Sequence, residues 1–166
     1  MKGPVCKDDI RSGRLCMICA AKLKAKQINE LDFETMKAVE KLENKKFLIS
    51  TEIVRVFELN GVALIFAKGN VGALIGKEGK NVKALEKALG KRVRIIELSK
   101  KPREVTQQVI GRARITAVNK LFKPGSEELR IMIDPRDKRM LEKEIKRMQE
   151  ILGKALKIQI ELKFAQ

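Results

Sequence analysis

The fold is decided by the stretch VGALIGKEGKNVKALEKAL, residues 71–89, which contains a four-residue loop with glycine at both ends, Gly76-Lys77-Glu78-Gly79. Apolar residues flank this loop at helical spacing, which predicts a helix before it and a helix after it. Two glycines separated by two residues let a backbone approach a ligand without obstruction by Cβ atoms. Because amides at the start of a helix favour anions, the stretch predicts a loop that can hold a negatively charged ligand.

Positive charge gathers around the same loop. Lys80, Lys83 and Lys87 recur on one face of the second predicted helix. The chain of 166 residues has a net charge of +16, and residues 64–103 alone hold eleven Lys or Arg against three Glu. A basic excess concentrated in this way indicates a polyanionic partner, with nucleic acid as the first candidate.

The loop and its flanks resemble a known RNA-binding module. The stretch ALIGKEGKNVKALEKALGKRVRII resembles the KH modules of NusA-type transcription factors, whose GXXG loop binds the backbone of about four nucleotides. The resemblance implies RNA contacts at Ile75, Gly76, Lys77, Glu78, Gly79, Lys80, Val82, Lys83 and Arg94, with Ile96 as an alternative to Arg94. A purely structural helix-turn-helix corner remains the other interpretation of the loop.

The segments around the loop predict the rest of the first module. An amphipathic helix is expected over 32–45, with Asp32 as its N-cap. Strands are expected over 51–59, 62–67 and 91–98, the first two joined by a hairpin turn at Asn60-Gly61. The resulting order, helix-strand-strand-helix-helix-strand, is that of the type II KH fold.

The second half of the chain repeats this order. We expect a helix over 104–112, strands over 115–122, 128–134 and 156–162, a turn at 123–126 and a continuous helix over 136–152. Residues 139–143, RMLEK, match the position of the glycine loop and contain no glycine. A degenerate module is therefore predicted, whose basic row over 136–147 either contacts phosphates or forms a solvated helix face.

These patterns divide the chain into three parts. A cysteine-containing extension covers 1–28, a first KH module covers 29–101, and the degenerate second module covers 102–166. The charged, proline-containing break at 100–103 separates the two modules. The predicted fold class is α+β, with two fused type II KH modules.

All three cysteines lie in the N-terminal extension. Cys16 and Cys19 form a C-x-x-C pair, a spacing that lets two thiolates reach one ion from a tight turn. Cys6 is the candidate third ligand of a zinc site, and Asp8, Asp9 or a second protomer could complete it. Reduced structural thiols and a disulfide remain open as alternatives.

Composition also restricts the function. The chain contains no histidine, the commonest acid–base catalyst, and we predict that it is not an enzyme. It has no apolar run of about eighteen residues and no signal-peptide pattern, so we expect a cytoplasmic protein outside the membrane. The resemblance to archaeal NusA-like proteins implies a single-stranded RNA-binding factor of transcription elongation or termination, with RNA polymerase as a partner. The alternative is a scaffold protein on the ribosome or polymerase whose RNA contact is incidental.

Overall fold

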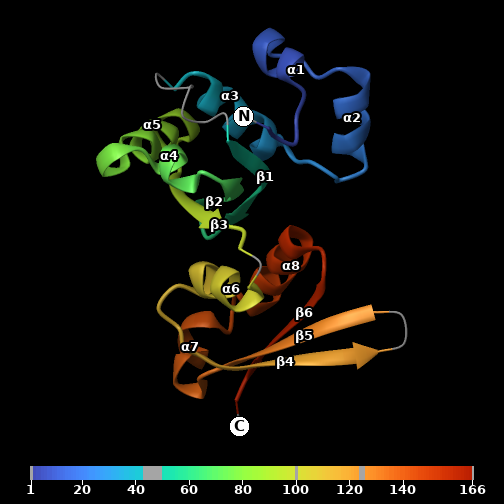
Figure 1. Ribbon diagram of the computed structural model, residues 1–166, viewed down its shortest axis with the longest axis vertical. Coiled ribbons are helices and arrows are strands. Elements are labelled where there is room, and N and C mark those ends of the chain that lie inside the picture. The colour runs from blue at the N-terminus through green and yellow to red at the C-terminus, as the bar shows by residue number, and fades with distance from the viewer. Residues whose placement is uncertain (1, 43–49, 100, 124–125, 166) are drawn as a thin grey trace. The chain divides into compact units, whose positions relative to one another are not determined.

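The chain folds as two α+β units, Met1–Glu97 and Leu98–Gln166, in a computed structural model (Figure 1). The structure describes residues 2–42, 50–99, 101–123 and 126–165. The predicted end of the helix at 43–45 and the centre of the predicted turn at 123–126 lie outside these residues. Among the described helices, none combines the length and the hydropathy that a membrane span requires.

The first unit is built on a three-stranded sheet of order β1-β2-β3. β1 (Thr51–Leu59) runs antiparallel to β2 (Val62–Gly69), and β3 (Arg92–Glu97) runs parallel to β2. Asn60 and Gly61 both have positive φ, 52° and 71°, as the predicted two-residue hairpin turn requires. The hairpin prediction is therefore confirmed.

Three helices cover one face of this sheet, namely α3 (Glu30–Glu40), α4 (Val71–Ile75) and α5 (Lys80–Leu89) (Figure 1). Their shared core contains Met36, Val39, Ile53, Val56, Ala63, Ile65, Ala67, Val71, Leu74 and Leu85. The β2 members of this core alternate along the strand, as residues on one face of a sheet must. This packing fixes α4 and α5, and hence the loop between them, against the sheet.

The start of α3 differs from the prediction. Asn29 is the N-cap, and its Oδ1 accepts a hydrogen bond of 2.7 Å from the backbone N–H of Asp32. The Asp32 carboxylate accepts the Asn29 backbone N–H at 2.8 Å, which completes a capping box. The prediction of Asp32 as the N-cap is wrong, because Asp32 occupies the third position of the helix (N3), where its side chain is fully buried.

Two short helices precede this arrangement, α1 (Lys7–Ser12) and α2 (Met17–Lys24). Val5, Ile10 and Ile28 belong to the same buried cluster as the core of α3 and β1. Lys2 also forms an isolated bridge with Glu52 of β1. The cysteine-containing segment is thus packed into the first unit.

The second unit repeats the strand pairing of the first. Its elements are α6 (Pro102–Ile110), β4 (Ile115–Lys123), β5 (Ser126–Ile133), η3 (Pro135–Asp137), α7 (Lys138–Leu141), α8 (Ile145–Leu156) and β6 (Gln159–Phe164). The sheet order is β4-β5-β6, antiparallel between the first pair and parallel between the second. α6 packs against α8 and β4, and α8 packs against β6.

The continuous helix predicted over 136–152 is wrong. The chain turns at 142–144, between α7 and α8, where the Glu144 N–H donates to the Leu141 carbonyl at 2.9 Å. Leu141 and Met148, on opposite sides of this turn, are both buried. The periodic pattern predicts the helical residues on both sides of this turn. It does not predict the turn itself, which lets Leu141 and Met148 both be buried in the second unit.

Acid should weaken the second unit through Asp134. Its carboxylate accepts hydrogen bonds from the Arg136 guanidinium, the shortest at 2.6 Å, and from the Arg136 backbone N–H at 3.0 Å. These bonds lower the pKa of Asp134 from 3.8 to about 2. A carboxyl with a lowered folded-state pKa stabilises the fold above its unfolded pKa, and this contribution is lost as the pH falls through the folded value.

We therefore expect the free energy of unfolding to decrease as the pH falls from about 4 to about 2. The Asp134→Asn variant should lose less stability over the same interval, because its side chain does not titrate. Urea titrations of both proteins at several acidic pH values measure this. Equal losses in the two proteins would contradict the assignment.

Candidate nucleic-acid interface

The glycine loop has an unusual backbone. α4 ends at Ile75, a single turn of 3-10 helix (η2) covers Lys77–Gly79, and α5 begins at Lys80. Gly76, Glu78 and Gly79 all have positive φ, at 75°, 53° and 73°. The Gly79 N–H donates to the Gly76 carbonyl at 3.1 Å, so the loop is closed by its own backbone.

The two glycines have different surroundings. A Cβ atom on Gly76 would lie 2.8 Å from Cγ and 3.1 Å from the backbone N of Asn81, so any other residue here would have to displace Asn81. The Asn81 Nδ2 donates to the Ala73 carbonyl at 2.9 Å and so joins α4 to α5. A Cβ atom on Gly79 would meet no described atom within 4 Å. Packing of the corner against Asn81 accounts for the glycine at position 76. At Gly79 no packing contact requires a glycine, and the space beside the loop is open.

The start of α5 offers backbone N–H groups at this open side. Its N-cap is Gly79, and no side chain of the described residues caps the first turn. The Lys80 N–H donates to the Lys77 carbonyl, and the following amides of such an uncapped first turn can bond to an anionic ligand. Lys77 and Lys83 are exposed and form no ion pair within the described part of the chain. Positive charge and the amides of a helix N-terminus therefore coincide here.

The apolar and strand residues of the predicted site differ in their exposure. Ile75 is 40% exposed, which is unusual for a large apolar side chain, and Val82 is half-buried. Arg94 is exposed on β3, while Ile96 has an exposed fraction of 0%. Of the two strand alternatives, only Arg94 is exposed, and its register partner Leu64 places it on the sheet face opposite to Ile65, which packs in the core beneath the helices. Glu78 and Lys80 are also exposed.

The corresponding turn of the second unit has different chemistry. Its residues 142–144 are Glu-Lys-Glu, and no glycine is among them. Several basic side chains nearby have carboxylate partners: Lys138 lies 3.6 Å from Glu142, Arg147 lies 3.4 Å from Glu150, and Arg136 pairs with Asp134. The sequence shows the missing glycines, but the partial neutralisation of this basic row appears only in the structure.

The three cysteines form a second candidate site. Ligand atoms of Cys6, Asp9, Cys16 and Cys19 all lie within 4.8 Å of one another, and the three thiols are free. Asp9 is buried, whereas Asp8 is exposed, so the structure selects Asp9 from the two predicted carboxylates. The sequence contained a signal for this choice, because Cys6-x-x-Asp9 has the same spacing as Cys16-x-x-Cys19.

The environment of these side chains changes their acidity. Burial and the neighbouring Asp9 carboxylate raise the pKa of the Cys19 thiol to about 12. The contact with Cys19 lowers the pKa of the Asp9 carboxyl. A cation bound among the sulfurs would reverse the effect on Cys19, because coordinated thiols are deprotonated.

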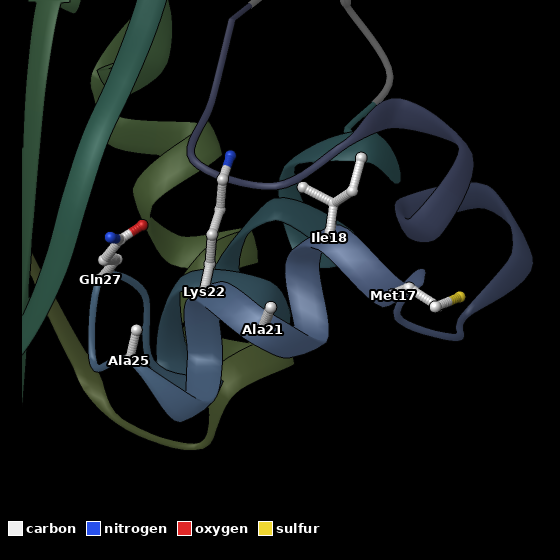
Figure 2. Close-up of a pocket in the computed structure, with 6 residues that line it drawn as sticks. All are labelled: Met17, Ile18, Ala21, Lys22, Ala25 and Gln27. Carbon is white, nitrogen blue, oxygen red and sulfur yellow. The ribbon is translucent and has the colours of Figure 1, made fainter.

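A shallow pocket lies on α2 and was not expected from the sequence. Its lining residues are Met17, Ile18, Ala21, Lys22, Ala25 and Gln27 (Figure 2). Met17 and Ile18 are 90% and 66% exposed. Apolar patches that are exposed on a protein surface often mark sites of contact with a partner.

The fold and the loop define an α+β protein whose glycine turn and helix N-terminus can hold an anionic backbone. Residues 38–124, more than half of the chain, match the KH domain family. The chain therefore belongs to the KH domain family, and the resemblance of the glycine loop to KH modules is confirmed. KH domains bind single-stranded nucleic acid through their GXXG loop.

Two individual relatives complete the comparison. The chain is 58% identical over 38 residues to the "Probable transcription termination protein NusA" of Methanocaldococcus jannaschii. This match covers 23% of the chain and 21% of the relative, so the aligned stretch spans about a fifth of that protein. The crystal structure of APE1850 aligns with 64% of this chain and 80% of its own, at 22% identity and a TM-score of 0.48.

Proposed function

We propose that the chain is a single-stranded RNA-binding protein of the NusA-like class, acting in transcription elongation or termination. The observation that carries RNA binding is the open side of the loop at Gly79. There the start of α5 has no side-chain cap, and Lys77 and Lys83 have no ion-pair partner, among the residues that the structure describes. The transcription role is supported by the name of the M. jannaschii relative, which matches over a short stretch.

In this proposal the backbone of the loop contacts the RNA backbone. Amides at the start of α5 donate to a phosphate, and the lysines neutralise neighbouring phosphates. Ile75 and Val82 form an apolar floor for bases, and Arg94 lies on the strand side. Because the sequence has no Trp or Tyr, bases would be held by apolar contact and hydrogen bonds, and sequence preference should be modest.

The second unit is proposed to be a degenerate type II KH module. Its strand pairing matches that of the first unit, but its turn carries two glutamates and its basic row is partly neutralised. Like charge at the turn would repel a phosphate. We propose that this unit does not bind RNA by a loop of its own, and that neither unit is an enzyme.

A salt titration of RNA binding tests the loop. Two double variants remove the same charge from the first unit: Lys77→Ala/Lys83→Ala at the loop, and Arg11→Ala/Lys24→Ala, both exposed, on α1 and α2. Each phosphate contact on a single strand contributes about −0.7 to the slope of log K against log salt. The slope of the loop variant should therefore be smaller in magnitude than the wild-type slope by about 1.4, and the control should keep the wild-type slope.

An equal reduction of the slope in both variants would show that binding reflects net charge alone, and an unchanged slope in the loop variant would show that Lys77 and Lys83 do not contact phosphates. A scaffold on RNA polymerase or the ribosome would then be favoured, for which the exposed Met17 and Ile18 offer a contact surface. Pull-down of polymerase by the full chain after nuclease treatment would separate the two functions. Complex formation that survives nuclease and high salt would support the scaffold.

A further inference from the structure

We propose that Cys6, Asp9, Cys16 and Cys19 bind one Zn²⁺ ion, and that this ion holds α1 and α2 on α3. The proposal is independent of RNA binding. It rests on the geometry of four side chains from two short helices.

The ligands come in two equivalent pairs. Cys6 is the N-cap of α1 with Asp9 three residues later, and Cys16 is the N-cap of α2 with Cys19 three residues later. Residues three apart at the start of a helix lie on one side of it, so each pair presents two ligands in the same direction. The Cys19 backbone N–H lies 3.5 Å from the Cys16 sulfur, an amide–sulfur contact common at structural thiolate sites.

Distances within the cluster suit a tetrahedral ion. Ligands about 2.3 Å from zinc at tetrahedral corners lie about 3.8 Å apart. Here the Cys6 and Cys19 sulfurs are 3.3 Å apart, and all four ligand atoms lie within 4.8 Å of one another. Small side-chain adjustments, with no change of the backbone, would bring them to a common ion.

The Asp9 carboxylate supplies an independent observation. Its Oδ2 is buried and has no hydrogen-bond partner among the described residues. A buried carboxylate oxygen without a partner is costly, and a bound cation would remove that cost. Asp9 thus completes the ligand set that three cysteines leave one short.

The chemistry of the set indicates zinc and a structural role. Three thiolates favour Zn²⁺ over Mg²⁺ or Ca²⁺, which prefer oxygen ligands. Four protein ligands leave no open position for a substrate, as in structural rather than catalytic zinc sites. α1 and α2 have 6 and 8 residues, too short to be stable as isolated helices.

The location of the cluster explains what the ion would hold. Cys19 is fully buried and shares a core with Ile10 of α1 and Met36 of α3. α1 packs against α3, and α3 packs against α5, the helix that follows the glycine loop. Loss of the ion should therefore loosen the N-terminal segment first.

Metal content and cobalt substitution test the proposal on the full chain. Purified under reducing conditions, the protein should contain one equivalent of zinc by elemental analysis. Co²⁺ should replace it with the thiolate charge-transfer and d–d absorption of a tetrahedral site. Loss of zinc to a chelator should speed proteolysis within residues 2–28, with the remainder of the first unit cut later.

Three variants of the carboxylates make the test specific. Outer-shell changes cost about 10- to 100-fold in metal affinity, so loss of a ligand in Asp9→Ala should cost at least about 100-fold. Asp8→Ala, at the exposed neighbour, should bind as the wild type does. Asp9→Cys should keep one ion and shift the cobalt spectrum toward that of four sulfurs, which guards against a misfolded Asp9→Ala protein.

Several results would overturn the proposal. One is a reduced wild-type protein that binds less than one equivalent of zinc or cobalt. Another is an equal loss of affinity in Asp8→Ala and Asp9→Ala. A third is thiol titration that finds a Cys6–Cys19 disulfide in freshly purified protein, which would assign the short sulfur contact to a covalent bond.

Discussion

Replacing Gly79 by aspartate should abolish RNA binding while the chain stays folded. The position has a φ of 73° and open space around a Cβ atom, so a side chain fits and only backbone strain of about 1–2 kcal/mol is added. The new carboxylate would lie beside the phosphate position, and like charges in contact cost several kcal/mol. We expect at least about a 100-fold loss of affinity for a short single-stranded RNA.

Gly90→Asp is the matched control for this variant. Gly90 lies at the other end of α5, also with positive φ, 64°, and with no described atom within 4 Å of a Cβ. It introduces the same charge and comparable strain away from the loop, and it should bind RNA nearly as the wild type does. Fluorescence anisotropy and circular dichroism of the three proteins give affinity and folding. Unchanged affinity in Gly79→Asp would show that the loop does not contact RNA and is only a structural corner between α4 and α5.

Replacing Asp32 by alanine should lower the free energy of unfolding more than any of the other substitutions above. Its fully buried carboxylate accepts the backbone N–H of Val56 at 2.6 Å and the Arg55 guanidinium at 3.2 Å. With the Asn29 contact, these bonds join α3 to β1. Removing the carboxylate leaves buried donors without a partner and an unpaired guanidinium, a change that costs about 3–5 kcal/mol.

Glu34→Ala controls for the loss of a carboxylate in the same helix, because Glu34 is exposed in α3. It should change the free energy of unfolding by no more than about 0.5 kcal/mol. Asp32→Asn should lie between the two, since its amide oxygen can accept one of the lost bonds. Urea denaturation monitored by circular dichroism gives the three values. A loss below about 1 kcal/mol in Asp32→Ala would contradict the role assigned to this carboxylate.

Much of the KH topology was predictable because its signals are local. Asn60-Gly61 specifies a hairpin turn through the positive φ that these residues tolerate, and the structure has this turn. The strands at Thr51–Leu59 and Val62–Gly69 follow from β-branched and apolar residues, and the helix after the loop follows from its apolar period. The Gly76–Gly79 loop was likewise evident from four neighbouring residues.

Errors arose where a residue's role depends on distant partners. Asp32 has the composition of an N-cap, but its contacts with Val56 and Arg55 make it a buried acceptor inside the helix. The segment 136–152 has a continuous helical period, yet the chain turns at 142–144 to bury Leu141 and Met148. Tertiary packing overrides local propensity at such positions.

By itself the sequence determined the KH loop, the order of strands and helices from α3 to β3 and the cysteines available for a metal, because backbone conformation and periodicity act over a few residues. Only the tertiary structure decided that Asp9, and not Asp8, joins the cysteines, and that Arg94 is exposed where Ile96 is buried. It also decided that some basic residues of the second unit, such as Lys138 and Arg147, have carboxylate partners, whereas Lys77 and Lys83 have none within the described residues. These features depend on distances between side chains that packing alone sets.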